Sequence, residues 1–176
     1  MLFRASGAGD ALRADVFLRP YGRVAGSHIH LRQEEHVAVI AGRIGYRSGR
    51  SEGVLGPRQA VTFERGVAHT IWNAGDSEAH ATIELRPAAG AEGAFEWLFR
   101  LAREGRTDEH GLPGPLELAV LAQRYGYFSA GTPLFVQRPL ASILAPIARA
   151  FGVGRGSTRP GDGAGPGRAD RGRRRG

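Results

Sequence analysis

The chain has 176 residues, with 24 Arg, no Lys and no Cys. This length fits one domain with extra helices or a tail and can bury a substantial core. The absent residues exclude lysine Schiff bases, thiol nucleophiles, disulfides and cysteine-ligated metals. The formal net charge is +7, but residues 152–176 hold seven Arg and two Asp (+5), so the rest of the chain carries only +2. We therefore expect no specific nucleic-acid binding by the folded part.

The first half of the chain is predicted to form short strands. Leu12, Ala14, Val16 and Leu18 alternate with more polar residues, which is the period of a half-buried strand. Further strands are predicted at 37–41, 43–47, 53–55, 59–63, 69–73 and 78–85. Turns that contain glycine separate them, including 48–50 and 73–76. Many short strands without intervening helices indicate a β-sandwich or barrel over residues 1–90.

Residues 91–151 change to a helical period and are predicted to form two or three helices that pack on the barrel or on a partner subunit. The first has apolar residues at helical spacing, and the second begins after Pro113 and Pro115. The third has an apolar stripe from Leu140 to Phe151, with Pro139 expected in its first turn and a kink expected at Pro146. We expect this stripe to pack against the body or a second copy, forming a homodimer, and we do not expect membrane contact.

The C-terminal segment 152–176 combines many Gly with seven Arg and has Val153 as its one apolar residue larger than Ala. Such a composition cannot bury enough surface to offset its ordering entropy, so we expect a disordered tail. Its charge would attract polyanions non-specifically. No apolar run has the length of a signal peptide or a membrane span, so we expect a cytoplasmic protein.

The chemistry of the chain concentrates in its histidines. His28 and His30 are two residues apart, so in a strand both imidazoles point to one face. Glu35 follows just before an apolar strand, and parity places it on one face with Val37, Val39 and Ala41. If that face is the barrel interior, Glu35 enters the cavity of the histidine pair. His69 opens a later strand.

Two imidazoles and a carboxylate on one side of a metal leave other positions open, as in non-haem iron sites. A third imidazole adds a fourth ligand without closing the site. These donors suit Fe, Mn, Ni, Co, Cu or Zn and disfavour Ca or Mg.

Two segments resemble the sequence motifs of the cupin superfamily. The first runs from Gly22 through His28-Ile29-His30 and Glu35 to Gly42, and the second is the segment 66–73, Gly-Val-Ala-His-Thr-Ile-Trp-Asn. The family's proline before the second motif is replaced by Glu64. The resemblance covers residues 12–87 and implies a jelly-roll barrel, a double-stranded β-helix, followed by helices. It implies one divalent metal ion on His28, His30, Glu35 and His69.

Other polar residues have competing interpretations. We expect His36, His80 and His110 at the surface. Asn73 satisfies backbone groups of its turn or, alternatively, contacts the site. Four further residues either lie on a solvated outer face, which we favour, or enter the barrel and bind an anionic substrate: Arg43, Tyr46, Arg47 and Arg58. We expect the aromatic group Phe95, Trp97 and Phe99 to pack rather than to hold a ligand.

Two functions remain open from the sequence. The first is a metal-dependent enzyme acting on a small molecule, either dioxygenase-like or an isomerase or cyclase. The second is a non-catalytic module that binds a small ligand or regulates a partner. No catalytic residue beyond the metal ligands stands out, and the substrate is not specified.

Overall fold

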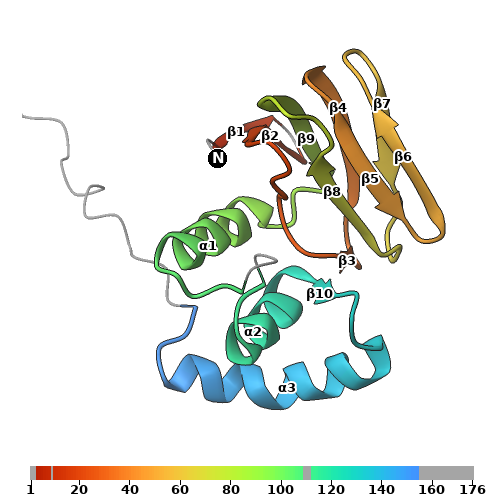
Figure 1. The fold of residues 1–176 in the computed structure, drawn as a ribbon. Helices are drawn as coiled ribbons and strands as arrows, with labels where there is room; N and C mark the ends of the chain where they lie inside the picture. The colour runs from red at the N-terminus through yellow and green to blue at the C-terminus, as the bar shows by residue number, and fades with distance from the viewer. Residues whose placement is uncertain (1–2, 9, 109–111, 155–176) are drawn as a thin grey trace, which may run out of the picture.

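The computed structural model describes residues 3–8, 10–108 and 112–154. The strands are β1 (Phe3–Ala8), β2 (Ala11–Leu18), β3 (His28–His30), β4 (Glu34–Ala41), β5 (Ile44–Ser48), β6 (Ser51–Leu55), β7 (Ala60–Phe63), β8 (His69–Asn73), β9 (Ala79–Arg86) and β10 (Tyr127–Ser129). The helices are α1 (Ala91–Arg103), α2 (Pro115–Tyr125) and α3 (Leu134–Ala150). The helices lie together at one end of the strands (Figure 1). Within the described residues, no helix combines the length and hydropathy needed to cross a bilayer.

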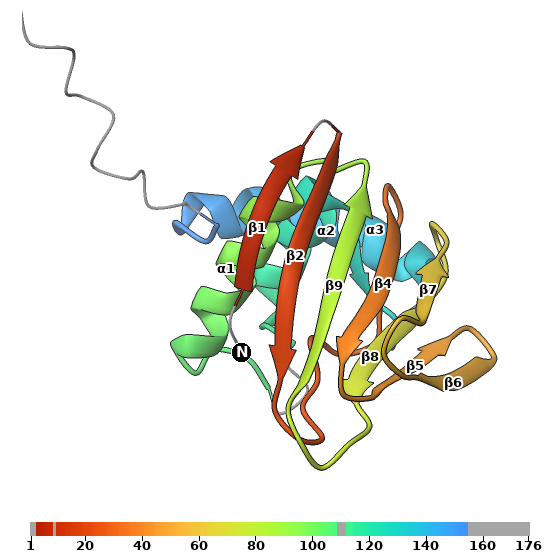
Figure 2. The ribbon, with the colours of Figure 1, turned by 90° about the horizontal axis from the view of Figure 1, so that it is seen from above.

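The strands form two antiparallel five-stranded sheets. Their orders are β1-β2-β9-β4-β7 and β10-β3-β8-β5-β6. Figure 2 shows the first sheet face-on, with the helices behind it. Neighbours in each sheet come from distant parts of the chain, as in β2 beside β9 and β3 beside β8. The predicted double-stranded β-helix architecture is confirmed.

Alternating burial along the strands places the core between the two sheets. In β9, Ala79, Ala81, Ile83 and Leu85 are buried, while the residues between them are partly exposed. They belong to an interior in which Phe63 is among the largest fully buried side chains. Burial of this apolar surface at about 25 cal/mol per Å² is the main force that holds the sheets together.

One parity prediction for β4 is wrong at its last residue. Glu35, Val37 and Val39 are buried, as the alternation predicts, but Ala41 is exposed. The pairing of β4 with β9 shifts register between Val39 and Ala41. The irregularity inserts an unpaired residue and ends the alternation. Because the shift lies beyond Glu35, it does not alter the inward direction of that side chain.

The helices have a core of their own. This core contains buried residues from all three helices: Trp97 and Leu101 of α1, Val120 and Leu121 of α2, and Ala145 of α3. Residues from β3 and β10 belong to the same cluster, so the helical core adjoins the second sheet directly. Helices α2 and α3 make their main contact along small residues of α3, namely Ala141, Ala145 and Ala148.

The predicted stripe of α3 packs against this body only in part, because Ala148 is buried and Leu144 packs on the helical core. Leu140, Ile143, Ile147 and Phe151 are exposed by 45–81%, because the alanine side of α3 lies against α2. The helix begins at Leu134, so Pro139 lies inside it rather than in its first turn. The stripe remains available for a second copy.

Two strands were not predicted. β1 pairs with β2 along six residues, and β10 pairs with β3 at the opposite sheet. β10 lies within the segment interpreted as helical. Residues 155–176, which include most of the predicted disordered tail, lie outside the described part of the chain.

Candidate metal centre

Three imidazoles meet where β3 runs beside β8. His28 and His30 point to the same side of β3, and His28 lies directly opposite His69 in the antiparallel pairing. Side chains directly opposite in such a pair share a face of the sheet. All three are buried, with 2–8% of their surface exposed. The pairing of β3 with β8 thus brings together the histidines of two segments that are far apart in the chain.

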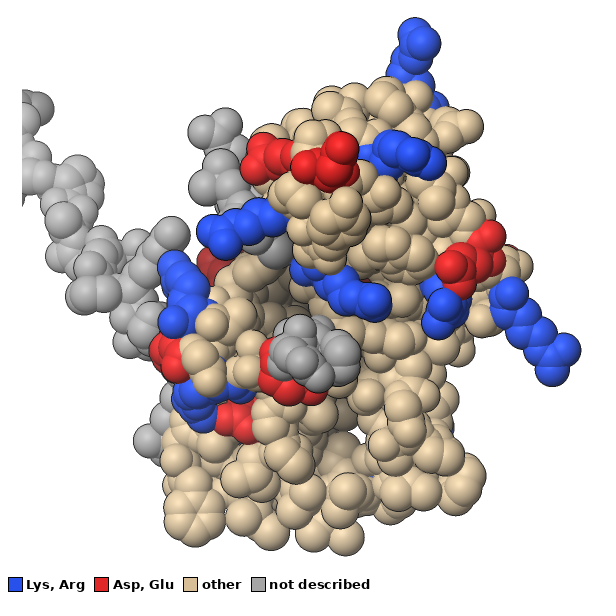
Figure 3. Space-filling view, in the orientation of Figure 1, with Lys and Arg blue, Asp and Glu red and all other residues tan. Residues whose placement is uncertain are grey.

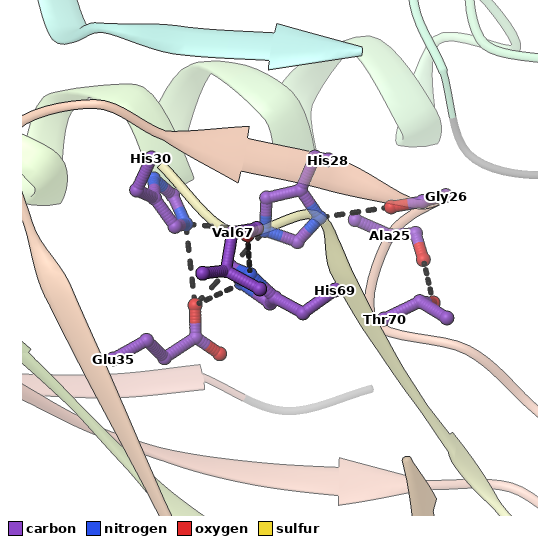
Figure 4. A network of polar contacts seen from close by, with 8 residues as sticks. All are labelled: Ala25, Gly26, His28, His30, Glu35, Val67, His69 and Thr70. Atoms are coloured by element: carbon purple, nitrogen blue, oxygen red, sulfur yellow. Dashed lines mark hydrogen bonds and ion pairs between the residues drawn. The ribbon is translucent and has the colours of Figure 1, made fainter. Parts of the chain in front are cut away.

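The carboxylate comes from the other sheet. Glu35 lies on β4 and reaches across the interior toward the three imidazoles (Figure 4). Its Oε2 is 3.2 Å from Nε2 of His30, 3.3 Å from Nε2 of His69 and 4.0 Å from Nε2 of His28. The Nε2 atoms of His28 and His30 are 3.1 Å apart. One donor atom from each residue lies within 4.8 Å of the others.

Backbone carbonyls orient two of the rings. His28 donates from Nδ1 to the carbonyl of Gly26 at 2.8 Å, and His69 donates from Nδ1 to that of Val67 at 2.9 Å. In His28 this bond leaves the lone pair of the neutral ring on Nε2, which faces the cluster, whereas Nε2 of His69 lies within hydrogen-bonding distance of Glu35. Phe63 stacks on His69 with ring centroids 4.5 Å apart and fixes its plane.

Burial and mutual charge set the protonation of the cluster. Burial lowers the pKa of His28 to about 3, and the neighbouring His30 and His69 contribute to the shift. Burial alone would raise the pKa of Glu35, but hydrogen bonds from His30 and His69 outweigh it and hold that pKa far below its ordinary value. Burial lowers the pKa of His69, whereas its hydrogen bond to Glu35 prevails and raises it. At neutral pH the cluster thus offers a carboxylate and a neutral imidazole, the ligand forms that metals require.

The donor set fits a divalent metal ion. Adjacent ligands of a six-coordinate ion with bonds of about 2.1 Å lie about 3.0 Å apart, and opposite ligands about 4.2 Å apart. Four of the six separations, from 3.1 Å to 4.0 Å, fall within this range, and all six lie within 4.8 Å. His28, His30, Glu35 and His69 could therefore hold a metal ion.

A large cavity adjoins the cluster. It has a volume of about 1060 Å³ and extends from the barrel interior to α1 and α2. Its walls include all four cluster residues, apolar side chains from both sheets and Trp97 of α1. Space-filling atoms show arginines on both sides of a hollow between the strands and α1 (Figure 3). The centre is therefore placed where a small molecule could reach it.

Among the residues of this cavity that sequence reasoning missed, Tyr127 lies beside the cluster. Tyr127 of β10 lies opposite His30, and its ring stacks on His28 at a centroid distance of 4.8 Å. Burial, with a smaller contribution from Glu35, raises the pKa of Tyr127 well above its ordinary value. The available sequence signal was Gly126, a helix-ending residue, followed by the aromatic pair Tyr127 and Phe128.

The remaining histidines stand apart from the centre. His36 is exposed and bonds to Thr62, as expected for the outer face of β4. His80 is half-buried, pairs with Asp15 at 3.0 Å and stacks on Phe17. His110 lies outside the described residues.

The arginine candidates proposed from the sequence do not line the cavity. Arg43, Arg47 and Arg58 are exposed, and Arg47 pairs with Glu52. Tyr46 packs against the barrel core. The arginines of the cavity wall are instead Arg19, Arg23, Arg100, Arg103 and Arg124. Phe95, Trp97 and Phe99 also line the cavity, and Trp97 belongs to the helical core.

Asn73 is structural. Its side chain is fully buried and bonds to backbone groups around its turn rather than to the centre.

The fold and the cluster together define a class of protein: a small jelly-roll barrel whose interior contains three histidines and one glutamate that could hold a metal ion. Residues 15–83 match the cupin domain family. The chain thus contains a cupin domain, which is followed by three helices. No match was found among curated proteins.

Several solved structures of low sequence identity are similar to part of this chain. A Thermus thermophilus protein, TT1209, is 20% identical over 48% of this chain and 83% of its own, with a TM-score of 0.45. A cupin-superfamily sugar phosphate isomerase from Silicibacter pomeroyi is 22% identical, covering 47% and 54%, with a TM-score of 0.44. A protein from Thermotoga maritima described as a predicted oxalate decarboxylase is 20% identical, covering 44% and 68%, with a TM-score of 0.42. At these levels the likeness specifies no reaction.

Proposed function

We propose that this protein is a divalent-metal-dependent enzyme that acts on a small molecule, either dioxygenase-like or an isomerase or cyclase. The observation that supports it is the convergence of four donor atoms within 4.8 Å on the wall of a cavity of about 1060 Å³. A purely structural role would not need three buried imidazoles and a buried carboxylate beside a cavity. The alternative is a module that binds a small ligand without turnover.

The chain's own residues have separate tasks in this proposal. His28, His30, Glu35 and His69 would hold the ion, and the carbonyls of Gly26 and Val67 orient two of the rings. A bound divalent ion would supply Lewis-acid polarisation or, if it is iron, redox chemistry toward O₂.

The test is the metal content of the purified protein, measured by plasma mass spectrometry. We expect about one equivalent in the wild type and well below that in His28→Ala and His69→Ala. His36→Ala is the matched control, because His36 is exposed on the outer face of β4. Low metal in the wild type, even after incubation with Fe, Mn, Co or Zn, would contradict the proposal. Oxygen uptake with phenols, diketones and thiols then separates the oxygenase branch from the other reactions.

We also propose that the protein is a homodimer formed through α3. Its outer stripe consists of Val136, Leu140, Ile143, Ile147 and Phe151, exposed by 41–81%. These residues recur every three or four positions, which is the spacing of a helix–helix seam. Together they expose on the order of 500 Å², so two copies face to face would bury about 1,000 Å², the lower bound of a specific interface. The stripe contains no charge, which suits pairing with itself.

A further inference from the structure

A buried tyrosine hydroxyl beside the candidate metal centre has no protein partner. Tyr127 is 5% exposed and lines the cavity that contains His28 and His30. Among the described residues, no donor or acceptor lies within hydrogen-bonding distance of its Oη atom. Buried tyrosine hydroxyls usually find a partner, because leaving one unpaired costs stability. This hydroxyl therefore has hydrogen-bonding capacity that the described protein groups do not use.

The position of this hydroxyl is determined by several independent contacts. The ring of Tyr127 stacks on His28 at 4.8 Å and meets His30 edge-on at 5.8 Å. β10 pairs with β3 over three residues, and the carbonyl of Gly126 accepts a bond from the amide of Leu31 at 3.1 Å. Gly126 has φ of 72°, which lets α2 end and the chain enter β10 at once. The ring is consequently held against the centre by backbone pairing on one side and ring stacking on the other.

The charges around the cavity indicate what kind of molecule enters. The wall contains five arginines and two glutamates, and one of these glutamates is Glu35 of the centre. The arginines come from the β2–β3 connection, from α1 and from α2. They are Arg19, Arg23, Arg100, Arg103 and Arg124. An excess of arginines over glutamates attracts anions, and guanidinium groups match the geometry of carboxylates.

We propose that Tyr127 donates a hydrogen bond from its hydroxyl to an oxygen of a small organic carboxylate bound in this cavity beside His28 and His30. The inference rests on the proposed metal-dependent function and adds the substrate class and a binding residue from outside the segment matched to the cupin domain. Tyr127 is thus a ligand contact supplied by the C-terminal segment. The hydroxyl is already buried and oriented, so it pays little entropy when the ligand arrives.

The test uses the intact protein loaded with Co²⁺, with malonate as the probe and the visible Co²⁺ spectrum as the readout. We expect malonate to bind the wild type and to bind Tyr127→Phe about tenfold or more weakly, as for loss of a hydrogen bond to a charged group. Co²⁺ stoichiometry should be unchanged in Tyr127→Phe. Tyr46→Phe is the matched control, because Tyr46 packs outside the cavity and should leave malonate affinity unchanged. Dimethyl malonate, which keeps the oxygens without the charge, should not bind.

A second readout needs no metal. Because the hydroxyl of Tyr127 has no described protein partner, its removal should leave the urea midpoint of the metal-free protein unchanged or raise it. A lowered midpoint would overturn the proposal by showing a structural role. Equal malonate affinity of Co²⁺-loaded Tyr127→Phe and wild type would also overturn it, as would a Co²⁺-loaded wild type that ignores malonate or binds the ester equally well. Failure of the wild type to hold Co²⁺ would instead refute the proposed function on which the inference rests.

Discussion

The replacement of Asn73 by alanine tests whether this residue of the second motif, residues 66–73, stabilises the barrel without contributing to the candidate metal centre. Asn73 ends β8 and is fully buried. Its amide nitrogen donates to the carbonyls of Leu18 at 3.0 Å, Arg19 at 3.1 Å and Ser77 at 2.7 Å. Its carbonyl oxygen accepts from the amide of Gly75 at 2.8 Å. One side chain thus ties the end of β2 to the turn before β9.

The expected loss follows from these contacts. Asn73→Ala removes two N–H donors and one acceptor, each with a net contribution of about 1 kcal/mol, so the free energy of unfolding should fall by about 3 kcal/mol. For a protein of this size, that corresponds to a decrease in Tm of about 6–12 °C. Buried carbonyls left without a donor would increase the loss, whereas entry of water would reduce it.

Urea denaturation and thermal melting measure the effect, with Asp76→Ala as the control. Asp76 is exposed in the same turn, so its replacement should change stability by no more than about 0.5 kcal/mol. Well below its Tm, Asn73→Ala should still bind metal as the wild type does, because no bond of Asn73 reaches the centre. A stability loss below about 1 kcal/mol, or loss of metal from the folded variant, would refute the reasoning.

Two further substitutions probe the second sheet and the proposed dimer. Gly45→Ala should lower stability by about 1–3 kcal/mol in urea, because its Cβ would clash with the indole of Trp72. Gly56→Ala is the control, since its nearest neighbour is 3.7 Å away, and equal effects would contradict this explanation. Ile143→Glu should convert the dimer into a monomer in light scattering by placing a charge in the outer stripe, whereas Ser142→Glu on the polar side should not. A monomeric wild type would refute the dimer.

The sequence contained enough information for the barrel and for the convergence of the four donors. Period-two alternation predicted that His28 and His30 share a face and that Glu35 points inward, and both features are present. The opposition of His28 and His69 needed strand pairing between distant segments, which periodicity alone does not supply. That pairing was instead expected from the resemblance of the two segments to the cupin motifs. The ligand roles themselves stay a prediction until metal is measured.

Other features could not be predicted, for physical reasons. The side of α3 that packs on α2 is made of alanines, because small side chains let two helices approach closely. A sequence search for large apolar residues therefore finds the opposite, exposed side. β10 has only three residues, and its stability comes from pairing with β3 rather than from local propensity. The register shift that exposes Ala41 likewise depends on the partner strand.

The pairing of β10 with β3 makes the helical segment part of the candidate centre. β3 carries two of the four donors, and β10 covers the edge that β3 would otherwise leave unpaired. A chain ending at Gly126 would lose α3, but it would also lose Tyr127 and expose that edge. Its oligomeric state would then reflect two changes at once, the loss of the outer stripe and new pairing at the exposed strand edge. Point substitutions separate these effects: Ile143→Glu changes only the outer stripe, and Tyr127→Phe removes only the buried hydroxyl.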